Sequence, residues 1–379
     1  MISQFNFPTP TRFGAGAINE LGPHLKQNNF ASPLVVTDPN VRKLGFFRAI
    51  VADLEQQGFT VQVYSEMHKN PVKTDVVNGA NHYRNTNCDC IVAIGGGVAM
   101  DVARAIALGV NNTDRDLLEY DELIGGDQYI TEPVPYFVTV PTTSGTGSEV
   151  GRSAIISEDE SKKKRILFHP TLLARQVFAD PELTNDLPPF VTAATGMDAL
   201  THNMEAYLAK NYHPMCDGIA LEGIRLIWNA IDEAVNRPTP ESRNDMMMGS
   251  LMGAVAFQKG LGVVHSLAHP LSALVDMHHG LANAICLPYG LRFNIAGFEN
   301  RFAAMAQVMG LSDHSGEAVV NALFDMNRKL GLPTTLSAEG VTVDQLDTLA
   351  DLAAADFAHP NNPKPVSRDD FRKLYEEAL

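Results

Sequence analysis

The feature that most constrains the fold is an alternation of short apolar runs with helix-like segments, which fills the first half of the chain. Residues 34–37 and 90–94 are typical of fully buried strands, and residues 59–63 alternate apolar and polar side chains as a half-buried strand does. Helix-like patterns at 44–57 and 98–109 follow two of these strands. Because strands separated by helices form parallel sheets covered on both faces, this half predicts an α/β domain.

The strand signals end after about residue 180, and one helical pattern follows another from Pro188-Pro189 to the C-terminus. Between residues 246 and 291 the only charged side chains are Lys259 and Asp276, although this segment holds four histidines. Helices that are apolar on every side are buried, so we interpret the segment as the interior of a helical domain. The chain therefore predicts two domains, α/β over residues 1–182 and all-α over residues 183–379.

The composition excludes several partners and locations. The 29 Lys and Arg against 44 Asp and Glu give a net charge of −15, which repels nucleic acid and anionic membranes. No window is apolar over the roughly 18 residues that a membrane span needs, and the N-terminus lacks the pattern of a signal peptide. We expect a soluble cytoplasmic protein with buried free thiols, because its four cysteines are too few and too scattered for a disulfide framework: Cys88, Cys90, Cys216 and Cys286.

A glycine run joins one predicted strand to the helix after it. Residues 93–101 read Ala-Ile-Gly-Gly-Gly-Val-Ala-Met-Asp, and glycines at a helix N-terminus allow phosphate to approach the backbone N–H groups. The spacing differs from a G-x-G-x-x-G fingerprint, because Met100 stands at the third glycine position. The alternative is a tight turn that only needs positive φ.

Two further strand ends carry polar residues that suit a ligand site. Residues 141–149 read Pro-Thr-Thr-Ser-Gly-Thr-Gly-Ser-Glu, and hydroxyls at the carboxyl end of a strand line ligand crevices in α/β sheets, although such a run is also typical of a solvated loop. Asp38 ends another strand. Its carboxylate is suited to accept the ribose hydroxyls of NAD, or alternatively to cap the turn before Pro39.

The strongest local signal is a set of possible metal ligands in the helical half. The candidates are histidines and one aspartate that stand in pairs along the chain. A single pair of this kind is typical of a surface ion pair or a satisfied core histidine, but buried imidazoles beside a carboxylate need partners or a cation. Imidazole and carboxylate ligands suit Fe²⁺ or Zn²⁺, and the absence of H-E-x-x-H gives a zincin-type protease no support. The candidates form two pairs at i, i+4 spacing and one adjacent pair: Asp198 and His202, His265 and His269, His278 and His279.

Several cations are placed near these motifs. Arg152 follows the Thr/Gly/Ser loop, and Lys259 precedes the histidine segment. Each either forms a salt bridge between domains or contacts an anionic substrate. The run Lys-Lys-Lys-Arg at 162–165 predicts a solvated turn, one member of which is able to reach a ligand.

Taken together, these motifs resemble the iron-containing alcohol dehydrogenase family. The resemblance rests on the three glycines with Asp101, the 141–149 loop, the Gly-Met-Asp-Ala-Leu-Thr-His segment at 196–202 and the histidine block, and it runs from about residue 11 to near the C-terminus. It implies an N-terminal dinucleotide-binding α/β domain and a C-terminal helical domain, with the active site in the cleft between them.

The resemblance also implies roles for individual residues. His269 corresponds to a histidine near the nicotinamide and the substrate, outside the metal's ligands, and His278 is left structural. Val98 stands where the family usually has Ser, which removes one hydroxyl contact to the pyrophosphate worth on the order of 1 kcal/mol. The implied metal ligands are Asp198, His202, His265 and His279. The implied dinucleotide contacts are Asp38, Gly95, Gly96, Gly97, Val98, Asp101, Thr142, Thr143 and Lys164.

By this resemblance we expect an NAD(H)-dependent, iron-dependent alcohol dehydrogenase or aldehyde reductase, with zinc as the second candidate metal. The metal would act as a Lewis acid that favours the alkoxide, hydride would pass to the nicotinamide, and His269 would relay the proton. A small primary alcohol is the first candidate substrate and an ω-hydroxy acid the second. We also expect a homodimer or a larger homo-oligomer, in line with the low charged fraction of 19%.

Two other functions remain in competition with this one. A metal- and NAD-dependent lyase resembling dehydroquinate synthase is the first, and the set of one Asp and three His argues against it. A protein that binds metal or nucleotide without catalysis is the second, and a ligand set with an open position beside a dinucleotide loop argues against that.

Overall fold

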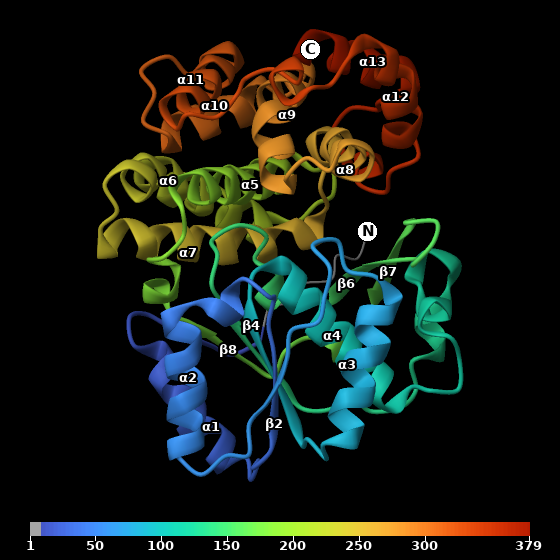
Figure 1. The fold of residues 1–379 in the computed structure, drawn as a ribbon. Coiled ribbons are helices and arrows are strands. Elements are labelled where there is room, and N and C mark those ends of the chain that lie inside the picture. Colours follow the sequence, from blue (N-terminus) through green and yellow to red (C-terminus); the bar gives the residue numbers. More distant parts are fainter. Residues whose placement is uncertain (1–8) are drawn as a thin grey trace. The chain divides into compact units, whose positions relative to one another are not determined.

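We use a computed structural model of the protein, which describes the structure of residues 9–379 (Figure 1). Packing within the chain divides it into two compact units. The sheet unit comprises residues 9–143 and Ser148–Thr184, and the helical unit comprises Ser144–Gly147 and Asn185–Leu379. Each unit is described by itself below.

The sheet unit is built on a six-stranded, fully parallel sheet, as the sequence predicts. Its strand order is β1-β8-β5-β4-β2-β3, and β2, β4, β5 and β8 are buried along their whole length. Gly95 pairs with Pro141 and Ala93 with Val36, so β2, β4 and β5 end at the same edge of the sheet. The strands are β1 Thr11–Phe13, β2 Pro33–Val36, β3 Gln62–Tyr64, β4 Cys90–Gly95, β5 Phe137–Pro141 and β8 Gln176–Ala179.

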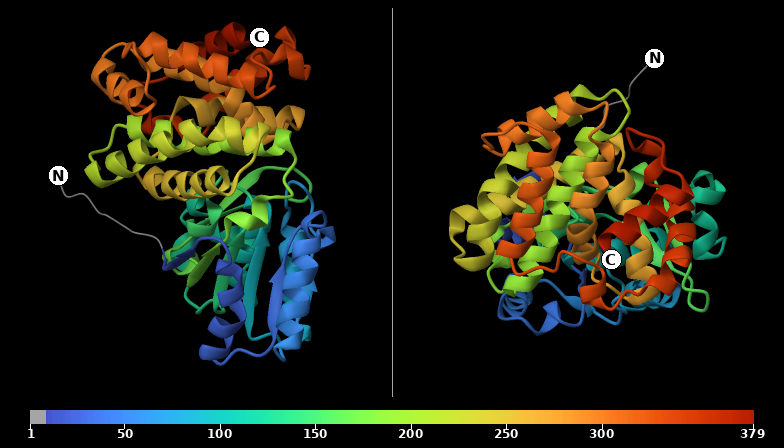
Figure 2. Two further views of the ribbon diagram at one scale, coloured as in Figure 1. Left: turned by 90° about the vertical axis from the view of Figure 1, so that its left-hand side faces the viewer. Right: turned by 90° about the horizontal axis from the view of Figure 1, so that it is seen from above.

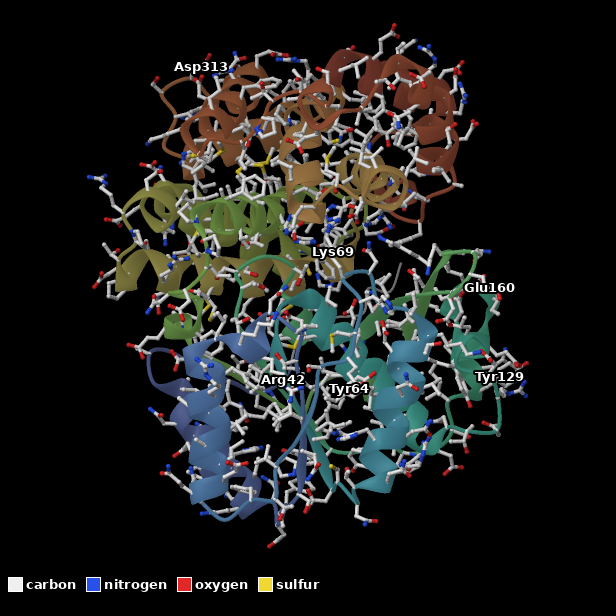
Figure 3. All side chains as sticks on the ribbon, in the orientation of Figure 1. Arg42, Tyr64, Lys69, Tyr129, Glu160 and Asp313 are labelled. Carbon is white, nitrogen blue, oxygen red and sulfur yellow. The ribbon has the colours of Figure 1, made fainter. Side chains whose placement is uncertain are left out.

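Helices cover both faces of this sheet because side chains alternate between its faces. Leu34 and Ile91 pack with helices α3 and α4, whereas Val35 and Val92 pack with α1 and α2. Tyr64, labelled in Figure 3, ties β3 to α3, since its hydroxyl donates to the main-chain oxygen of Asp75 at 2.5 Å. The helices are α1 Leu21–Gln27, α2 Gly45–Gln56, α3 Lys73–Asn85 and α4 Gly97–Asn111.

The sheet unit also contains an antiparallel hairpin that the sequence analysis missed. Strands β6 Ser153–Ser157 and β7 Lys164–Phe168 pair with each other, and Lys162 lies in the connecting turn with a φ of 59°. The prediction of a solvated turn over residues 162–165 is therefore wrong for its second half, because Arg165 is a strand residue that forms ion pairs with Glu158 and Asp121.

The helical unit is all-α, which confirms the predicted fold class, and no strand follows Ala179 in the described chain. Helix α5 begins at Pro189, where a proline needs no N–H partner. Helices α5, α6 and α7 pack against one another, and α5 and α8 also pack against α9 (Figure 2). The helices are α5 Pro189–Leu208, α6 Pro214–Asn236, α7 Pro240–Ala256, α8 Val263–Val275, α9 His279–Asn294, α10 Glu299–Val308, α11 Gly316–Lys329, α12 Leu346–Ala354 and α13 Arg368–Ala378.

Short 3₁₀ helices connect many of these elements. They are η1 Ala17–Glu20, η2 Val41–Lys43, η3 Leu117–Tyr120, η4 Glu122–Ile124, η5 Gly126–Tyr129, η6 Ser148–Val150, η7 Pro170–Leu172, η8 Pro181–Thr184, η9 Phe257–Lys259, η10 Ser337–Glu339, η11 Val343–Gln345 and η12 His359–Asn361. The four cysteines are buried and unpaired, as predicted. Among residues 9–379 no single helix is long and apolar enough to cross a membrane, although α7 with η9 and α8 pass the same test as a sharply bent pair.

Candidate functional site

Three loops meet at the carboxyl edge of the sheet. Asp38 follows β2, the glycine run follows β4, and Thr142 and Thr143 follow β5; these three strands are neighbours in the sheet. The N–H of Thr142 donates to the main-chain oxygen of Gly95 at 3.0 Å, which joins the second and third loops. The structure thus brings together the loop residues that the resemblance assigns to the dinucleotide.

The glycine run leaves a bare backbone surface between these loops. Gly95 has a φ of +153°, and a Cβ there would lie 2.6 Å from the Cβ of Ala99 and 3.6 Å from Oδ2 of Asp38. A Cβ on Gly96 would lie 3.2 Å from Oγ1 of Thr143. Helix α4 starts at Gly97 with no side chain capping its first N–H groups. A backbone cradle at an uncapped helix N-terminus suits a phosphate group.

The two carboxylate oxygens of Asp38 allow it both to cap the turn before η2 and to accept from a ribose. Its Oδ1 accepts hydrogen bonds from the N–H groups of Asn40 (2.8 Å) and Val41 (3.1 Å), so it caps the turn before η2. Its Oδ2 lies on the side of Gly95. Arg42, labelled in Figure 3, donates from Nη1 to Oγ of Ser65 at 2.8 Å instead of neutralising Asp38.

Asp101 is engaged by the protein itself. Its Oδ1 accepts from Oγ of Ser148 (3.0 Å) and Nη1 of Arg104 (3.2 Å), and its Oδ2 accepts from the N–H of Ile155 (3.1 Å). The fully buried Arg104 also donates to the main-chain oxygens of Ser148 and Ser153, each at 2.5 Å. Asp101 and Arg104 therefore fix the chain that follows β5. The sequence analysis missed Arg104, whose signal was that it is the one basic residue of the apolar helix α4 and lies three residues after Asp101.

The other predicted contacts lie in different settings. Val98 is the second residue of α4 and packs partly against the core beneath it. Lys164 begins β7, and its charge acts on Asp101: burial raises the pKa of Asp101, while the charges of Arg104 and Lys164 oppose that rise. At both positions a contact with the dinucleotide would come from a side chain, unlike at the glycine run, where the backbone N–H groups are open.

Glu149, the last residue of the Thr/Gly/Ser loop, is a buried acid. Its side chain is 3% exposed, and its Oε1 has no hydrogen-bond partner among the described residues. Burial raises the pKa of Glu149 to about 7, against the opposing charge of Arg104. The carboxyl group is therefore protonated in much of the protein near neutral pH.

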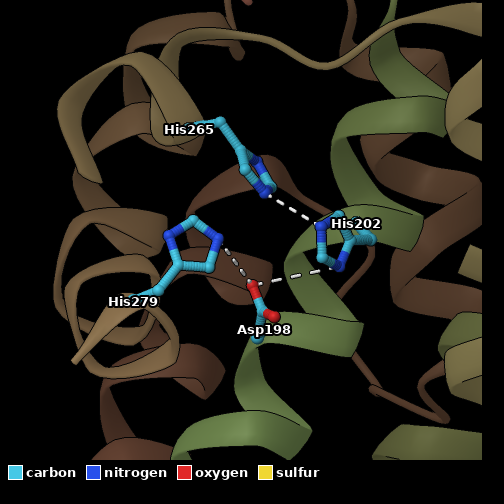
Figure 4. Close-up of side chains that lie close together, drawn as sticks. All are labelled: Asp198, His202, His265 and His279. Carbon is cyan, nitrogen blue, oxygen red and sulfur yellow. Dashed lines mark hydrogen bonds and ion pairs between the residues drawn. The ribbon is translucent and has the colours of Figure 1, made fainter. Parts of the chain in front are cut away.

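The helical unit gathers four of the predicted metal ligands into one cluster (Figure 4). Asp198 and His202 lie one turn apart on α5, His265 lies in the first turn of α8, and His279 begins α9. One donor atom from each of the four lies within 4.8 Å of the others. His278 precedes this cluster as the residue before α9 and is outside it.

The distances within the cluster suit a small divalent cation. Nε2 of His202 lies 3.1 Å from Nε2 of His265, and Oδ1 of Asp198 lies 3.5 Å from Nε2 of His279. Two nitrogens bound tetrahedrally to one metal ion at about 2.0–2.1 Å stand about 3.3 Å apart. Nδ1 of His202 is buried and has no hydrogen-bond partner in the described chain. That nitrogen lies 3.9 Å from Oδ1 of Asp198, while Nε2 of the same ring faces Nε2 of His265, so a single cation in the cluster would satisfy one of the two ring nitrogens of His202.

The protonation states agree with that interpretation. Burial lowers the pKa of His202 to about 4 and that of His279 well below its ordinary value. Burial acts to raise the pKa of Asp198, but the facing histidines lower it overall. Burial acts to lower the pKa of His265, and its bond to Glu205 raises it overall, so a cation would displace a proton there.

Glu205 is a functional residue that the sequence analysis missed. Its Oε2 lies 2.6 Å from Nδ1 of His265, and its two oxygens accept from the N–H groups of Val264 (2.7 Å) and His265 (3.2 Å). The carboxylate thus caps α8, which begins after Gly262 and has no capping side chain of its own. It also turns Nε2 of His265 toward the cluster, as carboxylates beside metal-binding histidines do.

His269 lies one helical turn after His265 and outside the four-residue cluster. Its ring stacks on that of His279 (5.5 Å between centroids, 14° between planes) and on that of Phe357 (5.3 Å, 29°). Its Nδ1 lies 2.8 Å from Oδ2 of Asp356, a second carboxylate that the sequence analysis missed. No local pattern marks Asp356, because its partner is 87 residues away.

Family models match nearly the whole chain. Residues 8–181 match the model described as iron-containing alcohol dehydrogenase, and residues 192–379 match the C-terminal model of the Fe-containing alcohol dehydrogenase family. The chain belongs to the iron-containing alcohol dehydrogenase family. It is thus an oxidoreductase of the alcohol dehydrogenase type, and the predicted reaction class and fold are confirmed.

Members of this family resemble the chain over its full length. It is 41% identical to a 4-hydroxybutyrate dehydrogenase of Cupriavidus necator over 376 residues, which cover 96% of each protein. A 1,3-propanediol oxidoreductase structure aligns over 100% of both chains at 32% identity and a TM-score of 0.93. A sulfoacetaldehyde reductase from Bifidobacterium kashiwanohense, solved in complex with NAD⁺, covers 100% of this chain and 99% of its own at 27% identity and a TM-score of 0.89. The predicted cofactors, NAD and a divalent metal ion, are those of the family.

Lys259, one of the two cations predicted to contact substrate in this dehydrogenase, is committed elsewhere. It is 1% exposed, and its Nζ forms an ion pair with Asp217 and donates to the main-chain oxygen of Tyr207 at 2.9 Å. The prediction that Lys259 contacts substrate is corrected, because its ammonium group is buried away from solvent and is already bound by these two partners. Its ion pair also lies within the helical unit instead of joining two domains.

Arg152, the second predicted cation, is partly exposed and directly precedes β6 in the sheet unit. Its guanidinium lies 5.2 Å from the centroid of the Phe168 ring. No salt bridge within 4.0 Å to Arg152 is found in the part of the chain that the structure describes, although its charge acts on Glu122, where it opposes the rise in pKa that burial causes. Its contact with substrate stays a prediction.

Proposed function

We propose that the protein interconverts a small primary alcohol and its aldehyde with NAD(H), with Fe²⁺ or, as second candidate, Zn²⁺ held by Asp198, His202, His265 and His279. The observation that carries this proposal is the buried four-ligand cluster in a chain of the iron-containing alcohol dehydrogenase family. The bound cation supplies Lewis acidity toward the substrate oxygen, and the bound nicotinamide supplies the hydride acceptor.

The chain's own residues bind, orient and move a proton in this scheme. The backbone at Gly95, Gly96 and Gly97 holds the pyrophosphate, and Oδ2 of Asp38 accepts from the adenosine ribose. Oxidation of the alcohol removes a hydride and a proton, and His269 accepts the proton at Nε2. Its Nδ1 is held by Asp356, so Nε2 is the ring nitrogen left for this task.

An ω-hydroxy acid and its semialdehyde form the second candidate substrate pair. It is favoured by the 41% identity to a protein named 4-hydroxybutyrate dehydrogenase, compared with 32% for the 1,3-propanediol oxidoreductase. A carboxylate on the substrate needs a cation, and Arg152 is the remaining candidate because Lys259 is paired with Asp217. The net charge of −15 makes such a local cation more necessary.

The test is NADH formation from 1-butanol and 4-hydroxybutyrate, which share a four-carbon chain, by the iron-loaded enzyme and by its metal-free form. A small primary alcohol as substrate predicts the larger kcat/KM for 1-butanol, unchanged in Arg152→Ala. The second candidate predicts the reverse preference and a loss of about tenfold or more in Arg152→Ala for 4-hydroxybutyrate alone. Absence of NADH accumulation with every alcohol tested would contradict both and favour the lyase.

We further propose that the protein is a cytoplasmic homodimer or larger homo-oligomer. The four unpaired cysteines support a reducing compartment, and the charged fraction of 19% supports association with further copies. Light scattering on the purified holoenzyme measures the mass directly, and a value near 41.2 kDa would contradict the oligomer.

A further inference from the structure

We infer that Asp356 is a positioning residue for His269: it selects the ring nitrogen of His269 that faces the reacting groups. The inference rests on the proposed function for the role of His269 and extends it to a residue far away in the sequence. It is carried by a network of hydrogen bonds within the helical unit, which joins α8 to the turn before η12.

The carboxylate of Asp356 is held in place before it reaches His269. Its Oδ1 accepts from Oγ of Ser266 at 2.7 Å and from the N–H of Ala358 at 2.9 Å. Oγ of Ser266 in turn accepts from the N–H of His359 at 2.9 Å. The Asp356 side chain is 9% exposed. One oxygen is therefore fixed by two donors, and Oδ2 is left to meet His269.

This arrangement decides the tautomer of His269. Burial acts to raise the pKa of Asp356, but His269 and the donors on Oδ1 bring it to about 2, so the group is an acceptor at neutral pH. Nδ1 of His269 must then carry its proton toward Oδ2, and the neutral ring has its lone pair on Nε2. Nε2 has no hydrogen-bond partner among the described residues.

The ring is also held in one plane. His269 lies between the rings of His279 and Phe357, and Phe357 directly follows Asp356 in the chain. The Asp356-Phe357 dipeptide thus sets both the tautomer and the tilt of the imidazole. The pair of Glu205 with His265, one turn earlier on α8, uses the same Nδ1 contact but turns Nε2 toward the metal ligands.

The decisive variant is Asp356→Asn. Ser266 and Ala358 donate to Oδ1, so they keep the amide oxygen on their side and turn the amide N–H groups toward His269. The N–H donor then forces Nδ1 of His269 to become an acceptor and moves the ring proton to Nε2. Asp351→Asn on α12 is the matched control, because Asp351 is an exposed partner of Arg368.

The first measurement is independent of activity. In zinc-loaded protein with ¹⁵N-labelled histidines, the ring resonances of His269 are assigned by their loss in His269→Ala. We expect Nδ1 protonated and Nε2 bare in the unmodified protein and in Asp351→Asn, and the reverse in Asp356→Asn. An unchanged tautomer in Asp356→Asn would overturn the inference even if the proposed function holds.

The second measurement is the rate of alcohol oxidation. We expect Asp356→Asn to lower kcat about a hundredfold with little change in the KM for alcohol and with full metal content. The double variant with His269→Ala should be no slower than His269→Ala alone, because Asp356 acts through that ring. Additive losses, an unchanged kcat or loss of the metal in Asp356→Asn would each overturn it. An unmodified enzyme inactive on every alcohol would contradict the proposed function, and the tautomer measurement would still decide the inference.

Discussion

The sheet unit and the helical unit build their candidate sites from different parts of the chain. In the sheet unit the cradle is made of backbone: a Cβ at Gly95 would collide with Ala99, and one at Gly96 would make a tight contact with Thr143. In the helical unit the site is made of side chains from three helices, and carboxylates behind them set their orientation. The site in the sheet unit depends on the absence of side chains at the glycines, and the site in the helical unit depends on the presence of ligand side chains.

This difference has a consequence for how each site fails. A backbone site is lost by adding atoms, and its neighbours then shift to relieve the collision. A side-chain site is lost by removing or reorienting one donor, and the buried groups that remain are left without partners. The two sites should therefore respond differently to conservative substitutions.

The largest effect is expected at the metal ligands. His265→Ala removes one of four donors and leaves Glu205 buried without its partner, so metal content should fall and kcat/KM should drop more than a hundredfold. Metal analysis beside kinetics measures both. His269→Ala is the comparison and should keep its metal while losing turnover; retention of metal by His265→Ala would contradict the ligand assignment.

The next effect is expected from a carboxylate behind the ligands. Glu205→Gln keeps an oxygen to cap α8 but places an amide against His265, which should lower metal affinity about 10- to 100-fold. Competition with a chelator measures that affinity. Glu222→Gln, at an exposed ion pair with Arg225, serves as the control and should leave it unchanged.

The backbone site should respond to an added methyl group. Gly95→Ala requires a positive φ and a Cβ 2.6 Å from that of Ala99, so it should destabilise the fold by about 1–3 kcal/mol and raise the KM for NAD⁺ several-fold. Gly109→Ala is the control, because Gly109 lies inside α4 and the nearest atom to an added Cβ there is 3.7 Å away. In denaturant titrations Gly109→Ala should leave the free energy of unfolding unchanged or raise it. Equal losses of stability in both variants would contradict the idea that the backbone at Gly95 has a special role.

The smallest effect is expected at Asp38. Asp38→Asn keeps an oxygen to cap the turn at Asn40 but removes the charge that would face a 2′-phosphate, so the preference for NADH over NADPH should narrow about threefold to tenfold. The ratio of kcat/KM for the two cofactors measures it. Better use of NADPH than NADH by the unmodified protein would show that Asp38 does not discriminate.

The fold was largely predictable from the sequence because it follows from local patterns. The buried strands over 34–37 and 90–94, and the start of α5 after Pro188, depend on residues that are neighbours in the chain. The β6–β7 hairpin was missed because β7 begins with Lys164 and Arg165, and two charges at a strand start resemble a loop.

The site residues were predictable where they stand at a regular spacing along the sequence. The i, i+4 pairs on α5 and α8 mark four of the residues that lie near the cluster. Glu205 and Asp356 have no such signature, because their partners are 60 and 87 residues away and ordinary acidic residues are common. Lys259 was misinterpreted for the same reason, since its carboxylate partner, Asp217, comes from a different helix.

The buried carboxyl group of Glu149 makes the thermodynamic stability of the protein depend on acidity. Between pH 4.5 and about 7 an unfolded chain has released the Glu149 proton while the folded chain retains it, so the free energy of unfolding falls as the pH rises through this window. The shift corresponds to about 3 kcal/mol. Above that window the folded protein must hold a carboxylate with an unsatisfied oxygen. The stabilisation from this group, which lies in the loop after Thr142 and Thr143, is therefore lost as the pH rises through about 7.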